Sequence, residues 1–245
     1  SKGRTFTIFL QDPRTGTGAA DVIWVPAHDR LRGENVIVTL TSPHPLRPKV
    51  LASSRANPDP RLSRLKGQLL AMILGGPSGD YEFGPQDHQA LANIAALCLH
   101  KGYALMVTPS RRTPPDCLSL IRQSLAAAGA TQETCFIWDG EGDNPYIPIL
   151  AMAEVIIVTG DSVNMVGEAC ASGRPVHVYQ PSGGHSKTFG FVEALIKAGY
   201  VRPWRGEIEN WTYEPLDSTG LIATRIAEFY RAHQERIQTQ IRTGA

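Results

Sequence analysis

From Gln68 onward, short apolar runs alternate with stretches of helical periodicity, and this alternation constrains the fold more than any other feature of the sequence. The expected strands are Leu69–Leu74, Ala104–Val107, Cys135–Trp138, Val155–Val158 and Val176–Val178. The expected helices are Gln86–His100, Asp116–Ala128, Pro148–Ala153, Val163–Ser172 and Phe189–Ala198. Short buried strands that alternate with helices predict βαβ units, and therefore an α/β domain with a doubly wound parallel sheet.

A second group of strands precedes this domain. The candidates are Thr5–Gln11, Val22–Val25 and Val36–Leu40, and no convincing helix separates the first two. Prolines are dense in Thr41–Leu65, which we interpret as an interdomain connection with room for a short helix around Lys49–Arg55. At the other end of the chain, Ser218–Arg242 is amphipathic, so we expect this helix to pack on another element.

Charge and composition exclude several classes of function. The chain has 245 residues with 24 basic and 23 acidic side chains, which argues against a nucleic-acid partner or an acidic lipid surface. Hydrophobic residues make up 42% of the chain, but no apolar run approaches the ~20 residues that span a bilayer. The four cysteines are widely spaced, which favours buried thiols in a reducing, cytoplasmic compartment over a zinc site or disulfides. A strand-like run directly follows Ser1–Arg4, so we expect a chain that was processed or that starts inside a domain, without a signal peptide.

The loop after the expected strand Val155–Val158 gives the sharpest ligand signal. In an open parallel sheet, ligands bind outside the carboxyl ends of the strands. Ser162 can cap the next helix while leaving backbone N–H groups for an anion such as a diphosphate. Glu168, on the same helix, could accept hydrogen bonds from a ribose diol. The alternative is an ordinary N-cap at Ser162 and a solvated helix residue at Glu168.

Two other loops carry weaker signals. Arg111 and Arg112 follow a strand and precede a helix that we expect Thr113 to cap, and paired guanidinium groups there can grip phosphate. The alternative is a solvated surface pair. Gly75 and Gly76 permit close backbone approach, but their spacing to the next helix fits neither a P-loop nor a G-x-G-x-x-G motif.

Two further features invite a catalytic or metal interpretation. The loop 139–143 alternates acidic residues with glycines, but it lacks the remaining positions of a calcium loop, so we predict a flexible acidic loop and no metal site. His28 follows the expected strand Val22–Val25 and could act as a general base. A surface histidine without a catalytic role is an equally good interpretation.

Several strings of residues resemble one family. They are Gly75-Gly76-Pro77-Ser78, Thr108-Pro109-Ser110-Arg111-Arg112-Thr113-Pro114, Trp138-Asp139-Gly140, Asn144-Pro145-Tyr146 and the segment from Thr159 to Cys170. Gln11-Asp12-Pro13-Arg14 and Pro26-Ala27-His28-Asp29 match as well. The chain thereby resembles the bacterial relatives of the plant mitochondrial-fission (elongated mitochondria) proteins. That family is labelled as nucleoside-diphosphate-sugar epimerases or glycosyltransferases.

The resemblance implies a GT-B-like arrangement of two Rossmann-like domains with a nucleotide-sugar donor in the cleft. We expect residues 1–64 to be the end of the N-terminal domain plus a linker. Residues 65–217 would form the nucleotide-sugar-binding domain, and residues 218–245 would form a helix that packs back on the N-terminal one. Family members carry a further N-terminal stretch, so we expect this chain to be one and a half domains of a longer protein. The substrate-binding candidates are Gly75, Gly76, Ser78, Ser110, Arg112, Trp138, Asn144, Gly160, Asp161, Ser162, Asn164, Met165 and Glu168.

Three functional hypotheses follow. The first is a metal-independent glycosyltransferase without a cofactor, in which Arg111 stabilises the departing diphosphate and His28 is the base. Its acceptor is unknown, and a membrane-associated glycan or lipid would place the protein at the inner membrane. The second is a nucleoside-diphosphate-sugar epimerase that uses the same cleft. The third is a non-catalytic adaptor that binds a protein partner.

Overall fold

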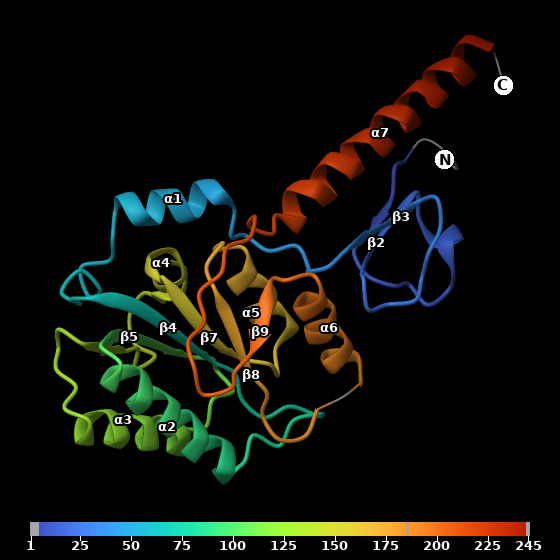
Figure 1. Ribbon diagram of the computed structural model, residues 1–245. Helices are drawn as coiled ribbons and strands as arrows, with labels where there is room; N and C mark the ends of the chain where they lie inside the picture. The colour runs from blue at the N-terminus through green and yellow to red at the C-terminus, as the bar shows by residue number, and fades with distance from the viewer. Residues whose placement is uncertain (1–4, 185, 244–245) are drawn as a thin grey trace. The chain divides into compact units, whose positions relative to one another are not determined.

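The computed structural model describes residues 5–184 and 186–243, which form two compact units (Figure 1). The smaller unit combines Ser1–Pro45 with Asp217–Ala245, and the larger unit is Leu46–Leu216. Residues 46–64, which we expected in the N-terminal part and its linker, therefore lie in the larger unit. Their helix α1 (Pro48–Ala56) packs against α4 (Tyr146–Met152), which explains why this proline-rich stretch is an integral part of that unit.

The larger unit is built on six parallel strands, as the alternation of strands and helices predicts. Their order in the sheet is β6-β5-β4-β7-β8-β9. The bounds are β4 (Gln68–Leu74), β5 (Tyr103–Pro109), β6 (Cys135–Ile137), β7 (Val155–Thr159), β8 (Val176–Tyr179) and β9 (Val201–Pro203). The first five match the expected strands closely, whereas the short edge strand β9 was not expected. Because the chain first winds outward from β4 to β6 and then from β7 to β9, the winding direction switches between β4 and β7.

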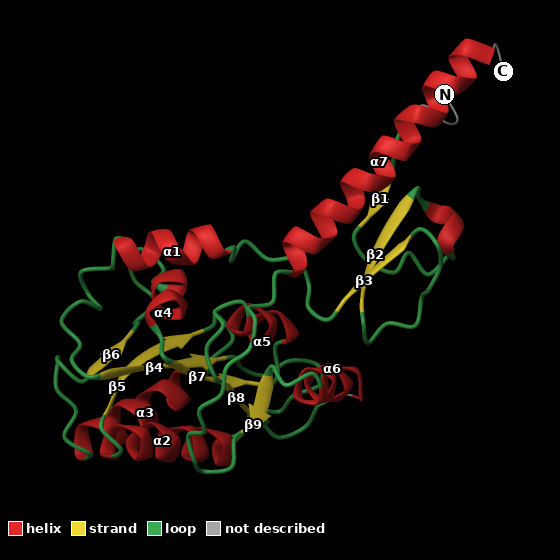
Figure 2. Cartoon of the chain, turned by 45° about the horizontal axis from the view of Figure 1, so that its top comes forward, coloured by secondary structure: helices red, strands yellow, loops and turns green. Residues whose placement is uncertain are grey.

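Helices cover both faces of this sheet (Figure 2). The bounds are α2 (Pro85–His100), α3 (Pro115–Ala127), α5 (Val163–Cys170) and α6 (Ser186–Lys197). Helices α2 and α3 pack together on one face, and α1, α4 and α5 lie over the other. The central strand β4 is nearly all apolar because both of its faces are buried. Its residues Met72 and Leu74 belong to the main core with Leu91 of α2 and Ile121 of α3.

The strand register brings the ligand-facing loops to one edge of the sheet. Ile73 of β4 pairs with Thr108 of β5 and with Val158 of β7. The three strands therefore end side by side, and the loops that begin at Gly75, Ser110 and Gly160 leave the sheet together. This edge is where an open parallel sheet binds its ligands.

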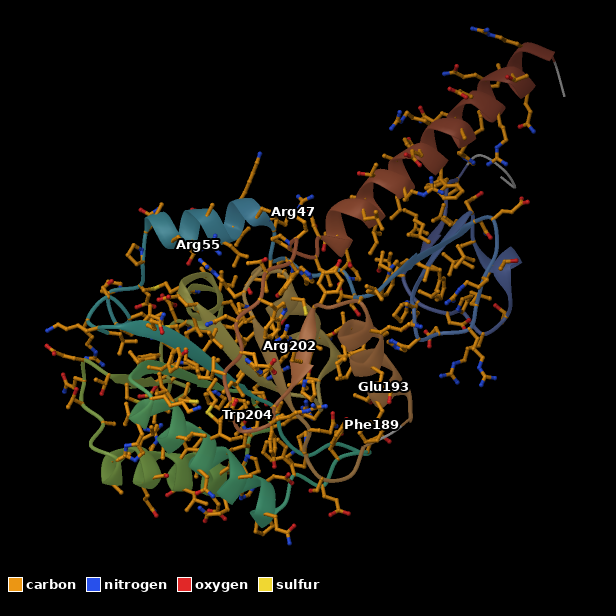
Figure 3. All side chains as sticks on the ribbon, in the orientation of Figure 1. Arg47, Arg55, Phe189, Glu193, Arg202 and Trp204 are labelled. Atoms are coloured by element: carbon orange, nitrogen blue, oxygen red, sulfur yellow. The ribbon has the colours of Figure 1, made fainter. Side chains whose placement is uncertain are left out.

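A cluster of aromatic rings packs beside the edge strand β9 of the larger unit's sheet. The buried ring of His177 in β8 lies edge-on to Trp204 and Trp211, with centroid distances of 5.8 and 5.2 Å. Its Nε2 accepts a hydrogen bond from the Glu209 N–H at 3.2 Å, and burial lowers the pKa of this histidine. Arg202, beside Trp204 in Figure 3, stacks over Trp211 and forms an ion pair with Glu209. The cluster thus holds the irregular segment after β9 against the sheet with a neutral histidine at its centre.

The smaller unit is a three-stranded parallel sheet with one long helix. It contains β1 (Ile8–Phe9), β2 (Val22–Pro26), β3 (Val36–Thr39), a short 3-10 helix η1 (Thr17–Ala19) and α7 (Ser218–Thr243). The helix packs Ile222 against Val22, Trp24 and Ile37 of the sheet, as its amphipathic pattern requires. The Trp24 indole donates a hydrogen bond to the Thr39 hydroxyl at 2.8 Å, which satisfies the polar atom of this buried ring.

The cysteines are all free thiols. Cys98, Cys117 and Cys170 are buried, as expected, whereas Cys135 is half-buried. Burial raises the pKa of Cys98 and Cys117 to about 12 and that of Cys135 to about 11, so these thiols stay protonated at neutral pH. Within the described part of the chain, no helix has both the length and the apolar character needed to span a membrane.

Candidate functional site

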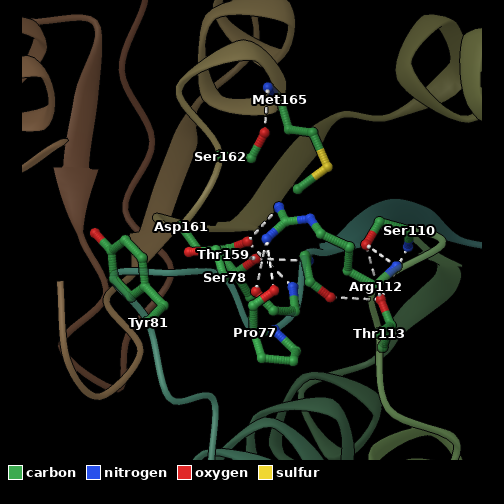
Figure 4. Close-up of polar contacts among 12 residues, drawn as sticks. Pro77, Ser78, Tyr81, Ser110, Arg112, Thr113, Thr159, Asp161, Ser162 and Met165 are labelled. Carbon is green, nitrogen blue, oxygen red and sulfur yellow. Dashed lines mark hydrogen bonds and ion pairs between the residues drawn. The ribbon is translucent and has the colours of Figure 1, made fainter.

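Hydrogen bonds join the β4 and β7 loops at the point where the winding of the sheet switches (Figure 4). The Thr159 hydroxyl accepts the Gly75 N–H at 2.7 Å and donates to Asp161 Oδ1 at 2.6 Å. The Gly76 N–H donates to Asp161 Oδ2 at 3.1 Å. Because the Asp161 side chain is fully buried, these contacts satisfy a carboxylate that water cannot reach.

Arg112 completes this network of hydrogen bonds with both of its terminal nitrogens. Its Nη2 lies 2.9 Å from Asp161 Oδ2, and its Nη1 donates to the carbonyls of Gly76 and Pro77 at 2.9 and 3.0 Å. Arg111 is exposed, and among the described residues it has no ion-pair or hydrogen-bond partner. Arg112 therefore holds the protein's own loop, whereas Arg111 makes no such contact, and the action of the two arginines as a pair on phosphate stays a prediction.

Thr113 has a different role from the one we expected. The N-cap of α3 is Pro114, which makes no side-chain cap. The Thr113 hydroxyl instead lies 3.0 and 2.5 Å from the carbonyls of Leu74 and Gly75, and it accepts the Ser110 N–H at 2.9 Å. It therefore ties the β5 loop to the end of β4.

The two glycines of the β4 loop are required by contacts inside the protein. A Cβ on Gly75 would lie 2.0 Å from Asp161 Oδ2, and one on Gly76 would lie 2.1 Å from the Arg112 carbonyl oxygen. We expected these glycines to permit close approach of the backbone to a ligand. The structure shows that the close approach is to the buried carboxylate and to the β5 loop.

The amino end of α5 opens beside this network. Ser162 is its N-cap, and the Ser162 hydroxyl accepts the Met165 N–H at 3.4 Å. The Val163 and Asn164 N–H groups have no acceptor among the described residues, and Asn164 is exposed. Both the capping role and the unpaired donors expected for this loop are thus present. Together they make a position where an anion would be stabilised.

Glu168 lies farther along α5 and is a half-buried acid rather than a solvated one. Its Oε2 accepts a hydrogen bond from the Tyr146 phenol at 2.6 Å, and Tyr146 is the first residue of α4. Burial raises the pKa of Glu168, although the bond from Tyr146 acts in the opposite direction. The Cα–Cβ bonds of a helix tilt toward its amino end, which for α5 is the end at the β7 loop.

The remaining candidates lie outside this network. Trp138 and Asn144 follow the edge strand β6, where they make local turn contacts with the Glu141 carbonyl and the Tyr146 N–H. Ser78 is exposed in the β4 loop. His28 belongs to the smaller unit, in the turn after β2. Its role as a base stays a prediction, as do the ligand contacts of the other residues.

A second buried carboxylate, that of Asp87, connects the β8 loop to the start of α2, and it was not predicted from the sequence. Asp87 Oδ1 accepts hydrogen bonds from the Tyr179 phenol at 2.8 Å and the Ser182 N–H at 3.0 Å. Its Oδ2 accepts the Gly84 N–H at 2.9 Å and the Ser182 hydroxyl at 2.5 Å. From the sequence, an acid in the first turn of a helix is expected only to cap that helix. The contact of Asp87 with the β8 loop becomes visible only in the folded structure.

Metal ligands do not gather in the described part of the chain, where no group of three His, Cys, Asp or Glu side chains could hold an ion. The acidic residues of loop 139–143 point outward, and the Glu141 backbone is held by Asp139 Oδ1 at 3.0 Å. What the site offers chemically is a set of backbone donors, one exposed guanidinium group and one half-buried carboxylate.

Comparison with known proteins places this chain in a family. The sequence pattern described as "Mitochondrial fission ELM1" matches residues 1–230. The chain belongs to this family. It is 26% identical over 251 residues to the "Mitochondrial fission protein ELM1" of Arabidopsis thaliana, covering 90% of this chain and 57% of the relative. It is also 31% identical over 169 residues to the "Uncharacterized protein RP120" of Rickettsia prowazekii (strain Madrid E), covering 64% of this chain and 45% of that protein.

This member of the mitochondrial fission ELM1 family spans about half the length of the curated relatives that it matches. Among solved structures, it is similar to MurG of Acinetobacter baumannii with a TM-score of 0.45 and 16% identity, over 84% of this chain and 51% of that one. A likeness of this size does not extend to a ligand or a reaction. The family assignment confirms the resemblance to the mitochondrial-fission proteins, whereas a bacterial origin and the epimerase label are not part of the family's description.

Proposed function

We propose that this chain is the donor-binding part of a metal-independent glycosyltransferase, with a nucleotide-sugar held where the sheet winding switches. The observation that carries the proposal is the arrangement of α5. Its amino end presents the N–H groups of Val163 and Asn164, which have no acceptor in the described part of the chain, and the half-buried carboxylate of Glu168 lies on the same helix. A nucleoside diphosphate carries both an anionic diphosphate and a hydrogen-bond-donating ribose diol.

The charge on the leaving diphosphate is what such an enzyme must stabilise. Backbone N–H groups at the start of α5 and the exposed guanidinium group of Arg111 are the donors available for it. Arg112 supports this arrangement indirectly, because its contacts with Asp161 fix the loops between which the donors lie.

The ionisation of Glu168 supports a functional role. Its pKa is raised in the folded chain, so the folded state binds a proton more readily than the unfolded state does. Ionised Glu168 therefore lowers the stability of the folded chain as the pH rises above the acid's ordinary pKa. A half-buried acid with a raised pKa, on the helix that follows a loop at the ligand-binding edge of the sheet, is typical of a ligand-binding position. Hydrogen bonds from a ribose diol would offset the penalty.

Thermal unfolding of the full chain with UDP-, GDP-, CMP- and dTDP-sugars tests the proposal. We expect at least one to raise the midpoint, because a ligand that binds only the folded state stabilises it. Glu168→Gln and Arg111→Ala should each remove the ligand-induced shift. The matched controls are Glu214→Gln and Arg64→Ala, which change the same side-chain types at exposed positions of the larger unit. We also expect Glu168→Gln to raise the midpoint of the ligand-free chain at neutral pH.

The proposal fails if no sugar nucleotide changes the midpoint, or if Glu168→Gln and Arg111→Ala respond like their controls. Turnover separates the two enzymatic alternatives. Slow hydrolysis of the bound donor supports a transferase, whereas solvent deuterium in the recovered sugar would support an epimerase and contradict the transferase.

One observation favours an adaptor as the second candidate. Ile8, Phe9 and Leu10 are consecutive in and after β1 and are 42%, 39% and 54% exposed. Contiguous exposed apolar side chains are typical of a surface that another protein, or a further part of a longer chain, covers. The Arabidopsis relative is itself named for mitochondrial fission and not for an enzymatic activity. Binding of a sugar nucleotide without turnover of any donor would favour the adaptor over the enzyme.

A further inference from the structure

We infer that Tyr146 is a positioning residue that holds the carboxylate of Glu168 in place for the ribose diol of a ribonucleotide. The inference rests on the proposed function, since it concerns the same helix and the same ligand. Tyr146 was not among the site residues predicted from the sequence. Together, Tyr146 and Glu168 would select the ribose part of the donor.

Backbone and side-chain hydrogen bonds fix the contact between Tyr146 and Glu168. Tyr146 starts α4 immediately after the β6 loop, and Asn144 fixes that start by accepting the Tyr146 N–H at 3.0 Å. From there the phenol reaches across to α5 and donates to Glu168 Oε2 at 2.6 Å. A glutamate side chain has several rotatable bonds, and a short bond to one oxygen removes most of that freedom.

The contact also leaves half of the carboxylate unused. The phenol has a single hydrogen, which it gives to Oε2, and no described residue donates to Oε1. A carboxylate oxygen can accept two hydrogen bonds, which is what the neighbouring 2′- and 3′-hydroxyl groups of a ribose provide. The tyrosine bond favours the ionised form of Glu168, which is the form that accepts from both hydroxyls.

The inference predicts a preference among nucleotides. A ribose presents two donors to Glu168, a 2′-deoxyribose presents one, and a 2′,3′-dideoxyribose presents none. We therefore expect dTDP-sugars to bind less tightly than UDP-sugars, and 2′,3′-dideoxy nucleotides to bind least. Hydrogen bonds to a charged group typically change affinity by about 10- to 100-fold each when they are removed.

The experiment measures calorimetric affinities of the full chain for UDP and 2′,3′-dideoxy-UDP, with GDP and 2′,3′-dideoxy-GDP as a second pair. We expect Tyr146→Phe to weaken the ribonucleotide by about tenfold and to leave the dideoxy nucleotide unchanged, so that their affinity ratio falls. Tyr213→Phe is the matched control, because it removes a phenol that donates at 2.6 Å to the Arg174 carbonyl elsewhere in the larger unit. It should preserve the ratio.

A double-mutant cycle separates positioning from a general loss of stability. In the Glu168→Gln background, Tyr146→Phe should have no further effect on the ratio of ribonucleotide to dideoxy affinity. If Tyr146→Phe keeps the wild-type ratio, or weakens both nucleotides equally, the inference is overturned while the proposed function stands. If the wild-type chain binds neither pair, the proposed function fails and the inference fails with it.

Discussion

Replacing Gly75 with alanine tests the central packing of the candidate site. An added Cβ would lie 2.0 and 2.1 Å from the two carboxylate oxygens of Asp161 and 2.4 Å from its Cγ. Contacts this short are not tolerated, so either the carboxylate or the β4 loop must move. Because the Asp161 side chain has no exposed surface, there is no open solvent into which it can rotate.

The size of the effect follows from what that movement breaks. Asp161 is held by Thr159 at 2.6 Å, by Arg112 at 2.9 Å and by the Gly76 N–H at 3.1 Å. Overpacking costs about 1–3 kcal/mol, and each weakened hydrogen bond costs about 1 kcal/mol more. Alanine also restricts the unfolded chain, which offsets about 0.4–1 kcal/mol. We therefore expect Gly75→Ala to lower the free energy of unfolding by about 3 kcal/mol.

Urea unfolding monitored by far-UV circular dichroism measures this free energy. The matched control is Gly79→Ala in the same loop, where an added Cβ meets nothing within 4 Å. We expect the control to change the free energy of unfolding by less than about 0.5 kcal/mol. In thermal unfolding, Gly75→Ala should lower the midpoint by about 6–12 °C for a unit of this size.

The decisive measurement repeats Gly75→Ala in an Asp161→Ala background. Removing the carboxylate removes the clash, so the loss of stability caused by Gly75→Ala should fall below about 1 kcal/mol there. The reasoning is refuted if Gly75→Ala is as stable as Gly79→Ala. It is also refuted if the loss is the same with and without the carboxylate.

Other parts of the structure give further expectations. Asp87→Asn puts an amide N–H group where the backbone N–H groups of Gly84 and Ser182 now donate to the carboxylate. It should lower the free energy of unfolding by about 2–3 kcal/mol in the same urea assay. A stability near that of the wild type would contradict this expectation. Because burial lowers the pKa of His177, the folded chain takes up fewer protons than the unfolded chain, so stability should be full above about pH 6.5 and fall as the pH drops below it. His177→Phe should flatten that dependence, and an unchanged slope would exclude His177 as its source. With a thiol reagent at pH 8, peptide mass spectrometry should find half-buried Cys135 modified well before Cys98 and Cys117, and equal rates would contradict the burial described above.

The secondary structure of the larger unit was largely predictable because its strands are short, apolar and separated by periodic helices. The expected strand Leu69–Leu74 and helix Gln86–His100 differ from β4 and α2 by a single residue at one end. Strand β9 was missed because a run of three residues at a sheet edge carries too little pattern to recognise. The short helix expected around Lys49–Arg55 exists, but nothing in the local sequence shows that it packs on α4.

The site was predictable as a place but not as a set of contacts. The loops after β4, β5 and β7 follow from the alternation of elements, and the rule for parallel sheets puts ligands there. That Asp161 binds the Gly76 N–H, 85 positions earlier in the chain, depends on β4 lying beside β7 in the sheet. No local sequence pattern predicts the order of the strands in the sheet. The same holds for Tyr146 and Glu168, whose residue types alone give no reason to pair them.

The smaller unit is assembled from the two ends of the chain, and this has a consequence for the order of folding. The buried hydroxyls of Thr41 and Ser218, 2.6 Å apart, bring together positions separated by 177 residues. Closing a flexible loop of that length costs about 4–5 kcal/mol of chain entropy. If the larger unit, residues 46–216, has already folded, most of the residues in that loop are already ordered and the remaining entropy cost is smaller. During synthesis β1–β3 are made before α7, and Ile222 of α7 belongs to their core, so we expect these long-range contacts to form late.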